Sequence, residues 1–121
     1  MNNYEFEKYK TTSDEILETI KKHGVAIIPD ILDSDEINNM RNGIWNYLEH
    51  ITSNFDRPIN RSDKSTWKQL RELYPLHSML IQRWGIGHAQ FNWDVRQNEK
   101  VINVFSKIWD VDSEELLTSF D

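Results

Sequence analysis

The sequence contains no cysteine, only 4 glycines and 3 prolines among 121 residues, and no long apolar run. The lack of cysteine excludes a disulfide scaffold, a thiol nucleophile and a zinc site built on thiolates. No stretch approaches the roughly 18 apolar residues of a membrane span, and the N-terminus lacks the basic and apolar segments of a secretion signal. These absences predict a soluble, intracellular and cytoplasmic protein with no membrane partner.

Basic residues are also few, because 14 Lys and Arg face 20 Asp and Glu and leave a formal net charge of -6. Affinity for nucleic acid depends on Lys and Arg that neutralise phosphates, so we expect no nucleic-acid partner. The length suits one domain with a modest core. We expect an N-terminal arm over residues 1–11 and a single domain over residues 12–121.

Helix signals open the predicted domain. Thr12 and Glu15 have the spacing of a capping box, which predicts a helix from about Ser13, and Gly24 can end this helix in the left-handed conformation. The run Val25-Ala26-Ile27-Ile28 is short, mostly β-branched and closed by Pro29. It therefore predicts a short strand that is buried on both faces.

A second capping-box spacing, Asp33 to Glu36, opens the longest predicted helix. Its apolar residues recur at steps of three and four, so that one face is apolar over about four turns. A stripe of methionine and aromatic residues can also indicate a cofactor site, but this spacing favours core packing. The residues of the stripe are Ile37, Met40, Ile44, Leu48 and Ile51.

Turn-forming residues then predict a long loop over residues 52–64, followed by a short helix that Ser65 caps and Pro75 ends. The loop carries Arg57 and Arg61. Solvated surface arginines are the simpler interpretation. The alternative is a loop whose arginines face an anionic co-substrate or the phosphates of a thioester.

The C-terminal third begins with Gly85-Ile86-Gly87-His88-Ala89-Gln90-Phe91-Asn92-Trp93-Asp94-Val95-Arg96-Gln97-Asn98. Polar and apolar residues alternate from position 88 to position 95, which predicts a strand or extended segment with His88 and Gln90 on one face. A helix is expected from about Asn98, a turn over residues 112–115 and a strand over Leu116 to Phe120. The helix should bury Val101, Ile102, Phe105, Ile108 and Trp109.

This order of parts resembles the region before the first iron ligand in phytanoyl-CoA dioxygenase-like proteins, which are non-haem Fe(II)/2-oxoglutarate oxygenases. The helix, His23-Gly24, apolar strand and Pro29 match the opening of such chains, so the resemblance runs from about Glu15 to Asp121. It implies an α+β fold: the mainly helical N-terminal part of a double-stranded β-helix, or jelly roll, with two short strands and an incomplete barrel.

The resemblance also points to four candidate site residues. His88, Gln90, Trp93 and Arg96 match the signature of the subgroup, which implies that they stand near the mouth of the pocket or brace it. The alternatives are an ion pair of Arg96 with Asp94 or Glu99, and a core position for Trp93.

The iron site of this family uses two histidines and one carboxylate, marked by His-x-Asp or His-x-Glu. None of the four histidines here has an acidic residue two positions later. We therefore assign no catalytic residue and no metal ligand, and expect no cofactor in this chain alone, whereas Fe(II) and 2-oxoglutarate serve the full-length family. A site made by His77, His88 and Asp94 remains an alternative.

Two functions follow. The first is a truncated or partial Fe(II)/2-oxoglutarate dioxygenase-like protein, inactive alone, whose partner is a complementary C-terminal oxygenase segment or a second copy paired through the Leu116 to Phe120 strand. The second is a small, non-catalytic helical binding module.

Overall fold

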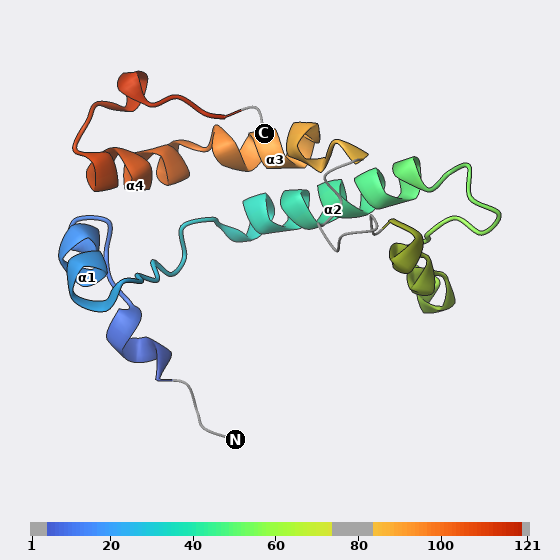
Figure 1. The fold of residues 1–121 in the computed structure, drawn as a ribbon, viewed down its shortest axis with the longest axis horizontal. Coiled ribbons are helices and arrows are strands. Elements are labelled where there is room, and N and C mark those ends of the chain that lie inside the picture. The colour runs from blue at the N-terminus through green and yellow to red at the C-terminus, as the bar shows by residue number, and fades with distance from the viewer. Residues whose placement is uncertain (1–4, 74–83, 120–121) are drawn as a thin grey trace. The chain divides into compact units, whose positions relative to one another are not determined.

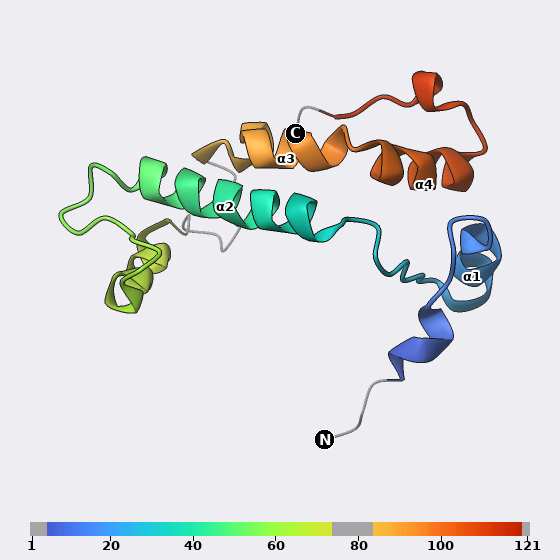
Figure 2. The ribbon, with the colours of Figure 1, turned by 180° about the vertical axis from the view of Figure 1, so that it is seen from behind.

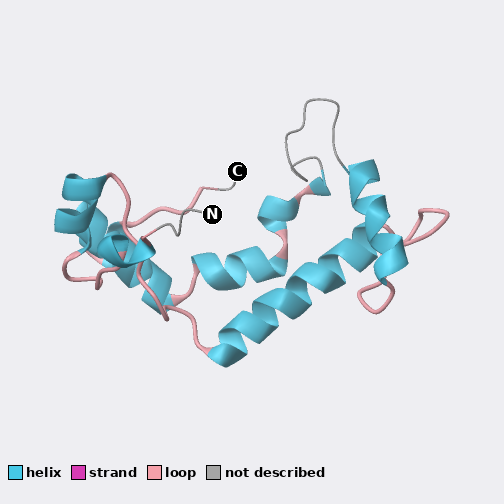
Figure 3. Cartoon of the chain, turned by 90° about the horizontal axis from the view of Figure 1, so that it is seen from below, coloured by secondary structure: helices cyan, strands magenta, loops and turns pink. Residues whose placement is uncertain are grey.

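The computed structural model describes residues 5–73 and 84–119, and these residues form helices joined by loops (Figures 1 and 3). Within these two ranges, four elements are α-helices and four are 3-10 helices. In chain order they are η1 (Phe6–Tyr9), α1 (Ile16–His23), α2 (Ser34–Ile51), η2 (Lys64–Leu73), η4 (Ile86–His88), α3 (Gln90–Arg96), α4 (Glu99–Trp109) and η5 (Ser113–Glu115). None of the helices in these ranges is long and apolar enough to cross a membrane.

The expected α+β, jelly-roll-derived class is wrong for the part of the chain that the structure describes. Of the predicted first strand, Ile27 alone pairs, in an isolated parallel bridge with Lys10. Residues 116–119 of the predicted last strand form no ladder, Leu117 is 96% exposed, and Phe120 lies outside the described residues. A strand needs neighbouring strands for its backbone hydrogen bonds, and neither segment has one here.

The chain divides into two compact units, and the first comprises residues 1–33 and 96–118. In this unit α1 packs against α4, Ile16 is buried, and Lys107 pairs with Asp14 at 3.2 Å. Gly24 ends α1 with a φ of 73°, and its N–H donates to Ile20 O at 2.8 Å, which confirms its predicted role. A left-handed glycine at this position satisfies a carbonyl at the helix end.

The start of α1 differs from the prediction. The helix begins at Ile16, and the flanking Glu15 makes no side-chain cap. Instead, the Glu15 N–H donates to Thr12 O at 3.3 Å in a turn that precedes the helix. A capping box forms where a plain turn was expected, between Asp112 and Glu115 in η5.

The helix expected from Asn98 is confirmed as α4, and the Asn98 side chain accepts the Lys100 N–H at 2.9 Å. Its predicted apolar face is only partly buried. Phe105 is 49% exposed and Trp109 is 67% exposed, so the expected burial of these two side chains is wrong within this unit.

The second unit comprises residues 34–95 and 119–121, and its core lies beside α2. The long helix is confirmed, and its Leu48 packs with Ile59 and Leu73 in a buried cluster. Thr52, which is fully buried, ties this core to the loop: its hydroxyl donates to Leu48 O at 2.8 Å and accepts from the Ile59 N–H at 3.0 Å. A buried hydroxyl with two such bonds satisfies backbone groups that would otherwise destabilise the fold.

In the same unit α3 lies alongside α2 (Figures 1 and 2). Phe91 of α3 is buried, and its ring meets the Tyr47 ring edge-on at 6.0 Å. The two helices approach closely because Gly43 has no side chain, and a Cβ built at Gly43 would lie 2.4 Å from the Phe91 Cβ.

Candidate functional site

The glycine-rich run of the C-terminal third folds as a turn followed by a helix, so the predicted extended segment is wrong. Gly85 adopts a φ of 69°, which favours glycine, and starts the single turn η4. The Asn92 side chain donates to Ile86 O at 2.5 Å and links the turn to α3. The buried Phe91 makes this helix part of the second unit, an interaction between distant residues that overrides the alternating pattern.

The four candidate residues occupy different positions along this segment. His88 is exposed in η4, and Gln90 is exposed at the start of α3, where it donates to Asp94 Oδ1 at 2.8 Å. Trp93 is partly buried, one turn after Gln90. Arg96 ends α3 and falls in the first unit, so only the other three can be considered together. The pocket roles that the resemblance implies for them stay predictions.

The described residues do not fit a facial triad for iron. Over 5–73 and 84–119, no three His, Cys, Asp or Glu side chains are grouped closely enough to hold a metal ion. His77, one member of the alternative site, lies outside the described residues. We therefore derive no step through iron from these residues.

The two loop arginines hold the loop against its own unit. The backbone N–H of Arg61 donates to Glu49 Oε1 at 2.8 Å, and its guanidinium donates to Glu49 Oε2 at 2.9 Å and to Asn46 Oδ1. Arg57 donates to Ser65 Oγ and lies 3.4 Å from Asp63 Oδ2. Arg61 thus clamps the loop to α2, whereas Arg57 also lines a cavity.

The Glu49 clamp predicts a dependence of stability on pH. Hydrogen bonds from the side chain and backbone of Arg61 lower the pKa of Glu49 below its ordinary value of 4.5. A lowered folded-state pKa stabilises the fold above the unfolded-state pKa, and this stabilisation disappears as pH falls through the folded-state pKa. We expect the urea midpoint to fall in that acid range, and to fall less in Glu49→Gln. Identical pH profiles for the two proteins would contradict the clamp.

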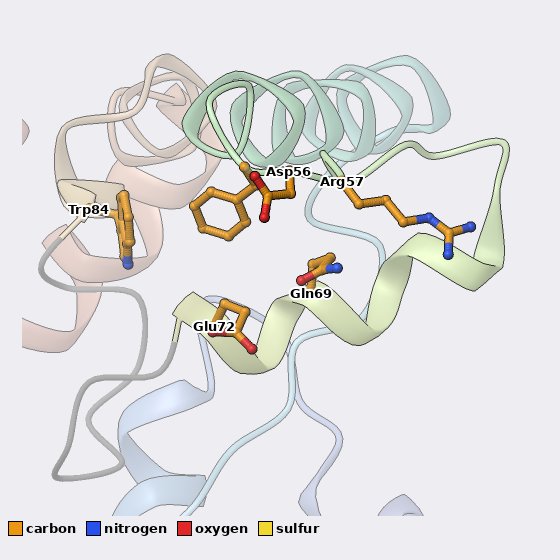
Figure 4. Close-up of a pocket in the computed structure, with 6 residues that line it drawn as sticks. Asp56, Arg57, Gln69, Glu72 and Trp84 are labelled. Carbon is orange, nitrogen blue, oxygen red and sulfur yellow. The ribbon is translucent and has the colours of Figure 1, made fainter.

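A cavity of about 560 Å³ lies in the second unit, beside the core. Its wall combines aromatic, acidic, basic and amide side chains from the loop, from η2 and from the segment before η4 (Figure 4). The lining residues are Phe55, Asp56, Arg57, Gln69, Glu72 and Trp84. The volume falls within the range of small-molecule sites.

Of this lining, the sequence indicated only Arg57 as a candidate for binding. Gln69 and Glu72 lie three residues apart in a short helix, and this spacing predicts that their side chains lie on the same face. The sequence spacing did not predict that Phe55 and Trp84 lie close together. These residues are far apart in the sequence, and their ring centroids come within 6.2 Å only in the folded unit.

No model of a known family, no curated protein and no solved structure matches the chain.

Proposed function

We propose that this chain is the helical part of an Fe(II)/2-oxoglutarate-dependent oxygenase of the phytanoyl-CoA dioxygenase kind, and that the iron ligands lie in sequence outside these 121 residues. The observation that carries the proposal is the run from Gly85 to Asn98, followed by a helix that ends in Ile108-Trp109 and by Leu116-Leu117-Thr118-Ser119-Phe120-Asp121. This order of parts is long and specific.

The local structure of the run supports the proposal, because several of its residues have distinct local tasks. Gly85 takes a positive φ, Phe91 fills the space that Gly43 leaves, and the Asn92 side chain holds the turn against the helix. In the family, decarboxylation of 2-oxoglutarate is coupled to hydroxylation of a substrate C–H bond, and we assign no step of that reaction to the described residues.

The nucleotide sequence after codon 121 tests the proposal. A continuing or neighbouring reading frame that encodes His-x-Asp or His-x-Glu within a few tens of residues is the expected result, because that spacing supplies two ligands of the facial triad. A genome in which no such frame follows would contradict the proposal. That outcome would instead favour the second function below.

A non-catalytic helical binding module is the second candidate, and the cavity of the second unit favours it. This cavity lies beside a core made by Leu48, Ile59 and Leu73, and the described residues build both without any contribution from a barrel. A complementary oxygenase segment would be the partner under the first function. Self-association through residues 116–120 remains a proposal, now without the strand that motivated it.

A further inference from the structure

The cavity of the second unit contains an aromatic corner. The rings of Phe55 and Trp84 lie 6.2 Å apart at an interplanar angle of 66°, so they form two walls that face in different directions. The faces of aromatic rings carry negative electrostatic potential and attract cations. Two such faces at an angle can contact one rounded, positively charged group from two sides.

Hydrogen bonds hold this corner in place. The Trp84 indole Nε1–H donates to Leu73 O at 3.1 Å, and the Trp84 carbonyl accepts from the Tyr47 hydroxyl at 2.7 Å. The Phe55 N–H donates to Thr52 O at 2.9 Å, and its ring packs against the buried cluster. A corner fixed in this way loses little conformational freedom when a ligand binds.

The charged groups of the lining favour a positive ligand. Asp56 and Glu72 bring two carboxylates to the wall. Arg57, the one cation among the described residues of the lining, donates to Ser65 Oγ and pairs with Asp63. Figure 4 shows its guanidinium at the end of the site away from Trp84, with Asp56 and Glu72 closer to the indole.

We infer that this cavity binds a small organic cation with an alkylated ammonium group. The aromatic corner receives the alkyl groups and the charge, the carboxylates of Asp56 and Glu72 supply the opposite charge, and the Gln69 amide offers a hydrogen bond to a polar tail. A bare metal ion is a poorer fit, because hard cations prefer a shell made of oxygen ligands. The inference holds under either proposed function, since the site belongs to the second unit and uses no iron.

Titration of the full chain with choline, followed by the NMR signal of the Trp84 indole, tests the inference. We expect saturation with a dissociation constant on the order of 1 mM, typical of a small ligand in an open site. The neutral isostere of choline, in which carbon replaces nitrogen, should bind about tenfold more weakly, because the cation–π and carboxylate contacts need the charge. Equal affinity for choline and its isostere would overturn the inference and leave an apolar cavity.

Two variants and one control locate the binding. Glu72→Gln, an exposed change that keeps the shape of the side chain, should weaken choline binding by about fivefold. Trp84→Leu should weaken it by at least as much, with the side-chain amide signal of Gln69 as the readout because the indole is gone. Glu114→Gln removes an acidic residue of the first unit and should change nothing. If Trp84→Leu unfolds the protein, the result for Glu72→Gln decides alone. No saturation at about 50 mM choline, unchanged affinity in Glu72→Gln, or tighter binding of inorganic phosphate than of choline would each refute the inference.

Discussion

Leu48→Ala should lower the free energy of unfolding by about 2–5 kcal/mol, the range for truncating a buried leucine. Leu48 is 8% exposed and packs with Ile59 and Leu73, so the change leaves a cavity in the core of the second unit. A small domain has a total stability of about 5 kcal/mol or somewhat more. Thermal unfolding followed by circular dichroism should therefore show that the variant loses most of its cooperative transition.

The matched control for this variant is Asn38→Ala, an exposed position on the same helix. Exposed substitutions of this kind change stability by about 0.5 kcal/mol or less. A Leu48→Ala midpoint within about 2 °C of the parent protein would mean that the stripe of α2 does not form a core.

Gly43→Ala should destabilise the protein although alanine favours helices. Helix propensity alone predicts that the free energy of unfolding rises by up to about 1 kcal/mol, because glycine is less favourable than alanine within a helix. The new Cβ would lie 2.4 Å from the Phe91 Cβ and 3.6 Å from the Phe91 Cα, so α3 has to move away from α2. Overpacking of this kind costs about 1–3 kcal/mol, so after the gain in helix propensity we expect a net loss of up to about 2 kcal/mol.

Urea unfolding measures this loss, and Asn42→Ala is its control. Asn42 precedes Gly43 on α2 and is exposed, so its replacement tests helix propensity without the close approach. The expected signs are opposite, a slight gain for Asn42→Ala and a loss for Gly43→Ala. A gain for both variants would show that α3 does not pack on Gly43.

Local signals in the sequence predicted several helix boundaries. Gly24 ends α1, and Asn98 caps α4, because each position depends on the backbone conformation and side chain of one residue. The sequence also predicted the apolar stripe of α2, because apolar residues recur with the helical period over the whole length of this helix. These features need no knowledge of distant parts of the chain.

The predicted strand after Gly24 and the predicted extended segment over residues 88–95 failed for the opposite reason. The apolar run after Gly24 has the composition of a strand, yet it makes one bridge, between Ile27 and Lys10, because no neighbouring strand is present among the described residues. The alternation from position 88 to position 95 was misread because Phe91 packs at Gly43, which lies far away in the sequence. The resemblance located four candidate site residues, His88, Gln90, Trp93 and Arg96. Their roles depend on which residues surround them in the folded protein, and the sequence pattern does not specify these neighbours.

The cavity shows the same limit. Arg57 was noted as a loop cation, whereas the interactions that decide its role, with Ser65 and Asp63, depend on how the loop folds. The aromatic corner joins residues on either side of η2 and needs the hydrogen bond from Trp84 Nε1 to Leu73 O. A glycine within a helical pattern, Gly43, was the one usable sign that another element approaches α2 closely.

The proposal that these helices belong to an oxygenase whose iron ligands lie elsewhere is tested most directly by anaerobic calorimetric titration with Fe(II) and 2-oxoglutarate. The 121-residue chain should bind neither specifically, whereas the protein made from a reading frame that also encodes the His-x-Asp segment should bind 2-oxoglutarate one-to-one when Fe(II) is present. A one-to-one complex of the chain alone with micromolar affinity that His88→Ala abolishes would contradict the account, as would the absence of binding by the longer protein.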